Sequence, residues 1–209
     1  AVRDIVASAF RSAGQRCSAL RCLYVQEDIA PHLLAMVKGA MDELTLGDPR
    51  ALVTDVGPVI DARAQAGILD YVAAREGAVL HRTAAPAEGT FVAPVMLKVS
   101  GIADLEREVF GPVLHVATFR AGELGTVIEA VNARGYGLTF GLHSRIDARV
   151  QEVAEAIRVG NTYVNRNQIG AVVGSQPFGG EGLSGTGPKA GGPLYLARFF
   201  APEPVAAPN

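Results

Sequence analysis

Apolar residues recur along this chain at two spacings, and the alternation of the two predicts a mixed α/β fold. Spacings of three and four residues predict amphipathic helices at about residues 5–10, 30–44, 62–75, 124–132 and 147–158. Short apolar runs predict strands at 22–25, 78–81, 90–99, 113–119, 138–143 and 162–165. Because strands alternate with helices of about a dozen residues, we expect a mostly parallel sheet covered by helices.

Capping and breaking residues refine the ends of these elements. Asp28 and Asp147 are expected to cap the helices that follow them, and Gly47 is expected to end the first long helix. Pro94 falls inside the run 90–99. Since proline cannot donate to a sheet ladder, we expect an edge strand or a bent strand there.

The character of the sequence changes at about Gly170. Glycine and proline dominate as far as Pro193 and no helical period survives, which is typical of a functional loop or an exchanged arm. Residues 180–185 match the dinucleotide pattern G-x-G-x-x-G, but no strand precedes them and no helix follows. We therefore do not expect a pyrophosphate-binding loop there. The Pro/Ala-rich tail 201–209 is expected to fray.

Composition narrows the class of protein further. The 209 residues are 49% hydrophobic, enough for one domain with a packed core, and the net charge of −2 gives no reason to expect nucleic acid. No apolar run is long enough for a membrane span, and the start lacks the features of a secretion signal. Two cysteines and four scattered histidines match no zinc spacing, so no metal site is expected. This composition suits a reducing cytoplasm.

One cysteine stands out as candidate chemistry. Cys17 lies between a glycine turn at Gly14 and small residues, with Arg11 and Arg16 nearby. Positive charge favours the thiolate, the reactive form, which can attack a carbonyl carbon and form a covalent intermediate. The alternative from this segment alone is a small, packed, apolar cysteine. Cys22 lies in a strand-like run and is interpreted as core packing.

Three segments, in this order, resemble the catalytic half of an NAD(P)-dependent aldehyde dehydrogenase. They are Gly-Gln-Arg-Cys at 14–17, Glu-Val-Phe-Gly-Pro-Val at 108–113 and Gln-Pro-Phe-Gly-Gly at 176–180. Ser18, the turn at 170–171 and the ending at 184–193 are similar to the glutamate-semialdehyde (pyrroline-5-carboxylate) dehydrogenase module of bifunctional proline utilization A enzymes. The resemblance extends over about residues 1–200.

The resemblance implies roles for three residues in the reaction. Cys17 would be the nucleophile that forms a thiohemiacetal and then a thioester, which water hydrolyses to the acid. Its backbone N–H would donate to the developing oxyanion. Glu108 would accept hydrogen bonds from the nicotinamide-ribose hydroxyls of NAD, and Phe110 would pack beside the nicotinamide.

The same resemblance implies a substrate and its binding residues. The substrate would be L-glutamate 5-semialdehyde, oxidised to L-glutamate in proline catabolism. Ser18, Gly170 and Ala171 would hold its α-carboxylate, the first by its hydroxyl and the other two by backbone N–H groups. Phe178 would form an aromatic wall against its aliphatic part. Asn165 would have a structural role.

The resemblance also implies how the chain is organised. Residues 1–190 would be the catalytic domain, and residues 191–209 an oligomerisation flap and tail, in which a strand from 191–199 joins a neighbour's sheet edge. The NAD-binding domain and the general-base glutamate would lie upstream of Ala1, so the chain alone is expected to be inactive. A homo-oligomer is expected, and FAD only if a proline dehydrogenase module lies upstream.

Two other functions remain open from the residues. Cys17, His143 and Asn165 have the order and spacing of a papain-like cysteine hydrolase, although no aromatic residue follows the cysteine and the chain has no Trp. The other is a non-catalytic assembly module, in which the glycine-rich segment mediates assembly and Cys17 is merely packed.

Overall fold

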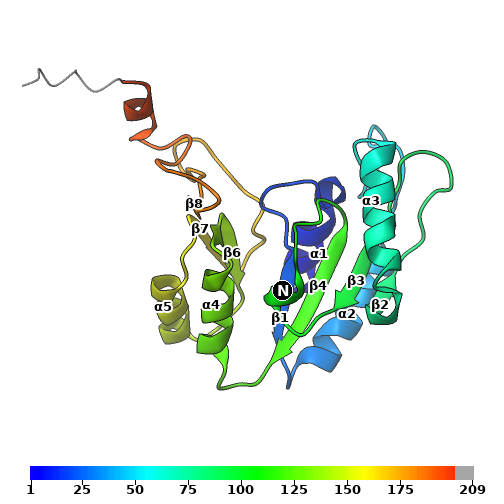
Figure 1. Ribbon diagram of the computed structural model, residues 1–209, viewed down its shortest axis with the longest axis horizontal. Coiled ribbons are helices and arrows are strands. Elements are labelled where there is room, and N and C mark those ends of the chain that lie inside the picture. Colours follow the sequence, from blue (N-terminus) through cyan, green and yellow to red (C-terminus); the bar gives the residue numbers. More distant parts are fainter. Residues whose placement is uncertain (201–209) are drawn as a thin grey trace, which may run out of the picture.

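A computed structural model describes residues 1–200 and shows a mixed α/β fold (Figure 1). The α-helices are α1 Val2–Phe10, α2 Ala30–Asp42, α3 Ala62–Ala73, α4 Leu124–Ala133 and α5 Asp147–Ala156. The strands are β1 Cys22–Gln26, β2 Val79–Arg82, β3 Val95–Lys98, β4 Val113–Phe119, β5 Tyr136–Gly137, β6 Thr139–Leu142, β7 Asn161–Val164 and β8 Glu181–Gly182. Short 3-10 helices are η1 Arg11–Gly14, η2 Glu76–Ala78, η3 Ile102–Asp104 and η4 Tyr195–Phe199.

The main sheet has the strand order β1-β4-β3-β2. Its first three strands are parallel and β2 is antiparallel to β3, so the prediction of a mostly parallel sheet is confirmed. In β4, all five residues from Val113 to Ala117 are buried. A continuous buried run means that both faces of the sheet are covered, as is typical of parallel sheets.

Helices α1, α2 and α3 cover the main sheet, and their apolar faces pack against it in one large core. The predicted apolar periodicity is confirmed in these helices. Figure 1 shows α3 standing beside β2 and β3. The most deeply buried side chains of this core include Phe10, Val37, Met41, Met96, Leu97 and Leu114.

A second, smaller unit contains β6 and β7, which pair in parallel, together with α4 and α5 (left in Figure 1). Its buried core consists of Ile128, Val153 and Ile157. A hydrogen bond of 2.7 Å from Arg134 Nη2 to the carbonyl of Leu105 ties α4 to the segment before β4. The two units therefore differ greatly in the amount of apolar surface that stabilises them.

Beyond β7 the chain forms an irregular arm, residues 170–200. Its middle part returns to the smaller unit, where β8 pairs with β5 and the Gly179 carbonyl accepts a hydrogen bond from Asn161 Nδ2, and only its end projects away in Figure 1. Isolated bridges join Val172 to Gln176 and Phe178 to Ala190, and no α-helix forms in it. The expected irregular segment is thus confirmed. The expected strand at 191–199 is wrong for the described residues, because Tyr195–Phe199 form a 3-10 helix that satisfies backbone groups locally. The predicted frayed tail 201–209 lies outside the described residues.

Several predicted element ends are wrong. Helix α2 ends at Asp42, before Gly47, and its N-cap is Ile29, while the Asp28 carboxylate accepts a hydrogen bond from Gln26. Asp147 is the first residue inside α5 and caps nothing. Side chains of this kind bond to whichever nearby donor is in reach, so the type of residue alone does not fix a cap.

The expected edge or bent strand around Pro94 is also wrong. Strand β3 starts after the proline and lies inside the sheet, between β4 and β2. The missing N–H of Pro94 therefore costs no ladder bond, and its carbonyl accepts one from Thr83.

Within residues 1–200, no helix has the length and apolarity needed to cross a bilayer. The same residues contain no group of three or more His, Cys, Asp or Glu side chains placed to hold a metal ion.

Candidate active site

A left-handed turn connects α1 to the loop that carries Cys17. Ser12, Ala13 and Gly14 all have positive φ, at 56°, 53° and 65°. A Cβ at Gly14 would lie 2.1 Å from the carbonyl oxygen of Gly111, so only glycine allows this approach. The turn thus brings the Cys17 loop against the loop that precedes β4.

The two cysteines lie in opposite environments. Cys17 is exposed and Cys22 is partly buried, and both are free thiols. Burial, and then the negative charge of Asp104, raises the pKa of the Cys22 thiol to about 12, so Cys22 stays protonated and inert near neutral pH. The exposure of Cys17 contradicts the alternative of a cysteine packed in the core and leaves it accessible for covalent chemistry.

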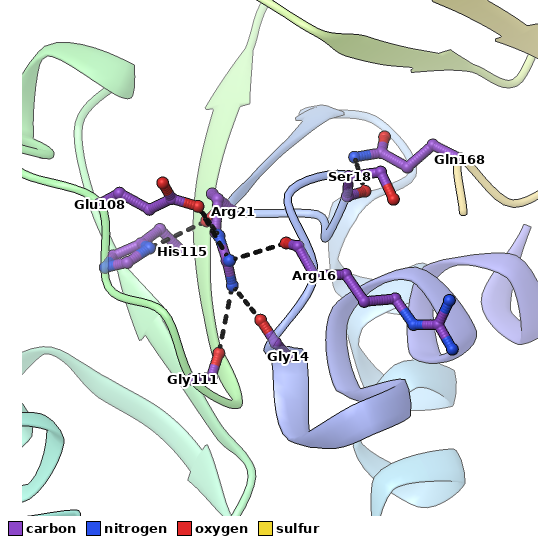
Figure 2. A network of polar contacts seen from close by, with 8 residues as sticks. All are labelled: Gly14, Arg16, Ser18, Arg21, Glu108, Gly111, His115 and Gln168. Atoms are coloured by element: carbon purple, nitrogen blue, oxygen red, sulfur yellow. Dashed lines mark hydrogen bonds and ion pairs between the residues drawn. The ribbon is translucent and has the colours of Figure 1, made fainter. Parts of the chain in front are cut away.

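The loop around Cys17 is anchored on both sides. Arg16 Nε donates to the Ser12 hydroxyl at 3.0 Å, and Figure 2 shows the Arg16 side chain directed away from Glu108. Ser18 is buried, and its carbonyl accepts a hydrogen bond of 3.2 Å from Gln168 Nε2. The loop is therefore fixed by contacts before and after Cys17.

Arg21 joins this loop to Glu108 (Figure 2). Its guanidinium donates to the carbonyls of Gly14 at 2.6 Å, Arg16 at 3.0 Å and Gly111 at 3.3 Å. Its Nε donates to Glu108 Oε1 at 3.0 Å. Burial lowers the pKa of Arg21 and the Glu108 carboxylate opposes that shift, yet the guanidinium remains charged.

Glu108 and Phe110 form an exposed pair beside this cation. The Glu108 side chain is 55% exposed, and Phe110 is 46% exposed. The Cζ of Arg21 lies 5.0 Å from the centre of the Phe110 ring. A carboxylate next to an open aromatic ring suits a ligand that presents hydroxyl groups and a flat ring, so these residues fit the ribose and nicotinamide of NAD.

A buried histidine supports Arg21 from β4. His115 Nδ1 lies 2.9 Å from the Arg21 carbonyl, and the Tyr71 hydroxyl lies 2.8 Å from His115 Nε2. This network assigns the proton to Nδ1, which donates to the carbonyl, while Nε2 accepts from the tyrosine. Burial is the main reason that the pKa of His115 is lowered, so the ring is neutral at pH 7.

The turn at Gly170 and Ala171 begins beside the Cys17 loop. Gln168 links the two segments, because its backbone N–H also donates to the Ser8 hydroxyl at 3.1 Å. The Tyr163 hydroxyl donates to the carbonyl of Gly170. Gly170 is half-buried and Ala171 is exposed. Of the predicted carboxylate-binding residues, Ser18 is thus bonded to the side chain of Gln168, which lies two positions before Gly170 in the chain.

Phe178 lies further along the arm. Its backbone pairs with Ala190 through hydrogen bonds of 3.0 and 2.9 Å. Within residues 1–200, no hydrogen bond or ion pair joins Phe178 to the Cys17 loop. The contacts of Arg21 thus bring together the Cys17 loop, Glu108 and Phe110, and Phe178 belongs to the arm that follows Gly170.

The other two residues of the hydrolase alternative have partners elsewhere. His143 Nε2 lies 3.8 Å from Asp4 Oδ2. The Asn165 side chain accepts from the Ser144 N–H at 3.0 Å and donates to the Ser144 carbonyl at 2.8 Å. Asn165 therefore holds the end of β6, in agreement with the structural role expected of it.

Sequence reasoning missed Arg21, Gln168 and His115. Arg21 carried one usable signal, a charged residue at the start of an apolar strand and four positions after the candidate nucleophile. No local pattern marks Gln168 or His115, because their hydrogen-bond partners Ser18, Tyr71 and Arg21 lie at least 44 positions away in the chain.

Comparisons with known proteins give the family of the chain and several relatives. A family model described as the aldehyde dehydrogenase family matches residues 1–203. The bifunctional protein PutA of Escherichia coli K12 is 53% identical over 216 residues, covering 99% of this chain and 16% of the relative. The 1-pyrroline-5-carboxylate dehydrogenase of Geobacillus kaustophilus is 40% identical, covering 99% of this chain and 41% of that relative.

Solved structures give the same result for the fold. A crystal structure of bifunctional proline utilization A has a TM-score of 0.92 at 54% identity, covering 95% of this chain and 20% of that chain. A 1-pyrroline-5-carboxylate dehydrogenase from Thermus with bound NAD has a TM-score of 0.86 at 32% identity, covering 95% of this chain and 39% of that chain. This chain spans less than half the length of each of these relatives.

Proposed function

The chain belongs to the aldehyde dehydrogenase family, and from that premise we propose that it is the catalytic part of an NAD-dependent L-glutamate 5-semialdehyde dehydrogenase of proline catabolism. The observation that carries the proposal is the arrangement around Arg21. One guanidinium holds the loop of an exposed cysteine, Cys17, and a carboxylate, Glu108, that stands beside an open aromatic ring.

The chemistry proposed for these residues is covalent catalysis. The Cys17 thiolate attacks the aldehyde carbon to give a thiohemiacetal, and the backbone N–H of Cys17 donates to the oxygen that becomes negative. NAD, when bound, supplies the hydride acceptor, so that Cys17 then carries a thioester. Hydrolysis of the thioester releases glutamate and restores the thiol. Glu108 holds the ribose hydroxyls and Phe110 packs beside the nicotinamide.

Substrate specificity is proposed to come from the residues around the arm. Backbone N–H groups of Gly170 and Ala171, with the Ser18 hydroxyl, bind the α-carboxylate of the substrate, and Phe178 covers its aliphatic part. The connection of Ser18 to Gln168, two positions before Gly170, supports this grouping.

We propose that a dinucleotide-binding portion and the general base lie outside residues 1–209, because all of the relatives above are more than twice as long. The 209-residue chain alone is then expected to oxidise aldehydes at least about 10²-fold more slowly than the longer enzyme, the usual cost of losing a general base. Steady NADH formation by the chain alone, at a rate comparable with that of a longer enzyme, would contradict this.

The arm is proposed to mediate self-association. It carries exposed apolar side chains, and an exposed patch of this kind is typical of an interaction surface. These residues are Val173, Leu194, Leu196, Phe199 and Phe200. A sedimentation measurement that finds only monomers at micromolar concentrations would contradict this part of the proposal.

The main test replaces the matching segment of Escherichia coli PutA with this chain. We expect the hybrid to form NADH from L-glutamate 5-semialdehyde, and Cys17→Ala to reduce the rate by more than about 10⁴-fold, as expected for the loss of a nucleophile. Cys22→Ala is the matched control and should retain the rate within about a factor of three, because it removes one small partly buried group. An active C17A hybrid would overturn the proposal.

A further inference from the structure

Arg21 makes more polar contacts than any role in local folding requires. Its Nη1 donates to the carbonyls of Gly14 and Gly111, at 2.6 and 3.3 Å. Its Nη2 donates to the carbonyl of Arg16 at 3.0 Å and lies 2.9 Å from Glu108 Oε1, which also accepts from Nε at 3.0 Å. All three nitrogens are thus engaged, and the Arg21 side chain is only 16% exposed (Figure 2).

The geometry of these contacts requires a guanidinium. The acceptors come from two loops, residues 14–16 before β1 and residues 108–111 before β4, and they surround one planar group with five donors. A lysine has three donors on one atom and cannot reach both loops in this way. Removing the cation would leave the Gly14 carbonyl and the Glu108 carboxylate without a hydrogen-bond partner among the described residues, whereas the carbonyls of Arg16 and Gly111 would keep their backbone donors, Ala19 and Val113.

The contact with Glu108 is made through one oxygen only. Both Arg21 contacts go to Oε1, and no hydrogen bond among the described residues involves Oε2. The carboxylate is thus held in one orientation while its second oxygen can accept hydrogen bonds from a ligand. Phe110, 5.0 Å from the guanidinium, is positioned by the same group.

The backbone of Arg21 is itself held from the interior of the sheet. Its carbonyl accepts from the His115 backbone N–H at 3.0 Å and from His115 Nδ1 at 2.9 Å. His115 is 1% exposed. A side chain that starts from so fixed a point and ends in several hydrogen bonds loses little further freedom when a ligand binds, so it preorganises the site.

We propose that Arg21 is a positioning residue that orients Glu108 for the ribose hydroxyls of NAD and fixes the Cys17 loop next to it. This inference rests on the proposed function, because it requires Glu108 to bind the cofactor. Arg21 itself touches neither substrate nor cofactor in this arrangement. Its loss should therefore act through Glu108, mainly on the KM for NAD, while loosening of the Cys17 loop lowers kcat.

The test measures the KM for NAD and kcat in the hybrid with Escherichia coli PutA. We expect R21M to raise the KM for NAD by at least about tenfold, the cost of one charge-assisted hydrogen bond. The KM for NAD of R21K should lie between that of R21M and that of the hybrid without a substitution. R82M is the matched control, because Arg82 pairs with Glu76 on the surface at 2.6 Å and should leave the KM for NAD unchanged.

A double-mutant cycle with E108Q decides whether Arg21 acts through Glu108. If it does, R21M/E108Q should have the same KM for NAD as E108Q alone. Two results would overturn the inference. In the first, R21M lowers the melting temperature without changing the KM for NAD. In the second, the increases in the KM for NAD caused by R21M and by E108Q multiply in the double variant. If E108Q leaves the KM for NAD unchanged, the proposed role of Glu108 fails instead.

Hydrogen exchange of the 209-residue chain tests the structural half of the inference without activity. R21M should speed exchange at residues 14–18 and at residues 108–111 together, by about tenfold or more, because one cation joins both loops. R82M should change neither. Faster exchange in only one loop, or in neither, would overturn the inference.

Discussion

The main sheet and the smaller β6–β7 unit with its arm carry different parts of the site. The main sheet has a large buried core and presents Cys17, Glu108 and Phe110 on loops that Arg21 ties together. The smaller unit has three buried core residues and leads into the exposed arm that carries Ala171 and Phe178. The proposed nucleophile and cofactor-binding residues thus lie on loops of the region with the larger core, together with Ser18, while the other residues proposed to bind the substrate lie on the arm of the region with the smaller core.

The two regions meet at Gln168, and this contact is the reason that the comparison matters for function. Its side chain donates to the Ser18 carbonyl and its backbone N–H donates to the Ser8 hydroxyl, so the start of the arm is fixed to the Cys17 loop and to α1. Only the more distant part of the arm, with Phe178, is free of that anchor. Changes in either region should therefore separate into different measurable effects.

The largest expected effect is on stability, from opening the core of the main sheet. Leu114→Ala removes a side chain that is 0% exposed and should lower the free energy of unfolding by about 2–5 kcal/mol. Ile128→Ala, in the smaller core and 5% exposed, should fall at the low end of that range. Urea unfolding of the 209-residue chain measures both.

Hydrogen exchange of the same two variants shows which part of the chain each substitution destabilises. L114A should raise exchange throughout β1, β3 and β4, whereas I128A should raise it mainly between residues 124 and 164. Equal losses of stability with the same spread of faster exchange would show that the two regions form one cooperative unit, and the comparison would fail.

The next effect is on substrate recognition by the arm. In the hybrid enzyme, Phe178→Ala should raise the KM for the aldehyde by about tenfold, the cost of losing one aromatic contact. Phe199→Ala is the matched control, since Phe199 is 73% exposed on the same arm. An unchanged KM for the aldehyde in F178A would remove Phe178 from the substrate site and leave the nucleophile region untouched.

The smallest effect is a pH dependence of stability that arises from His115, the buried residue that donates to the Arg21 carbonyl. His115 is buried, and its pKa in the folded protein is lowered from the usual value near 6.5. The unfolded chain therefore binds more protons, so this contribution to stability is present above pH 6.5 and is lost as the pH falls towards the folded pKa.

Urea unfolding between pH 7 and 5 measures this dependence. The slope from one such group cannot exceed about 1.4 kcal/mol per pH unit, and His115→Gln should reduce the slope. His143 contributes with the same sign, because burial also lowers its pKa, so H143Q is the comparison for the other region. An unchanged slope in H115Q would contradict a neutral His115 in the folded state.

The periodic parts of the fold could be predicted from the sequence, and the reason is local. Apolar spacing marks the helices and strands wherever one face or both faces are buried, as in α3 and β4. Pro94 misled the prediction because the strand starts at Val95, one residue after the proline, and not at the start of the run 90–99. The two-residue strands β5 and β8 have no local signal, since they exist only through their pairing.

The residues of the candidate site also divide into those that a local pattern predicts and those that only the folded chain shows. Cys17 and Glu108 could be named from short motifs that resemble a family, because those motifs are contiguous in the chain. The residues that hold them together could not. Arg21 reaches Glu108 across 87 positions and His115 reaches Arg21 across 94, so only the folded chain shows these contacts.

The most direct test of the central claim compares the two thiols of the folded chain. Iodoacetamide should modify Cys17 at least about tenfold faster than Cys22, because Cys17 is exposed and burial raises the pKa of Cys22 to about 12. Peptide mass spectrometry over a time course at pH 7.5 measures both rates in one sample. Equal and negligible modification of the two cysteines would contradict an accessible nucleophile at position 17, and with it the proposed catalytic role.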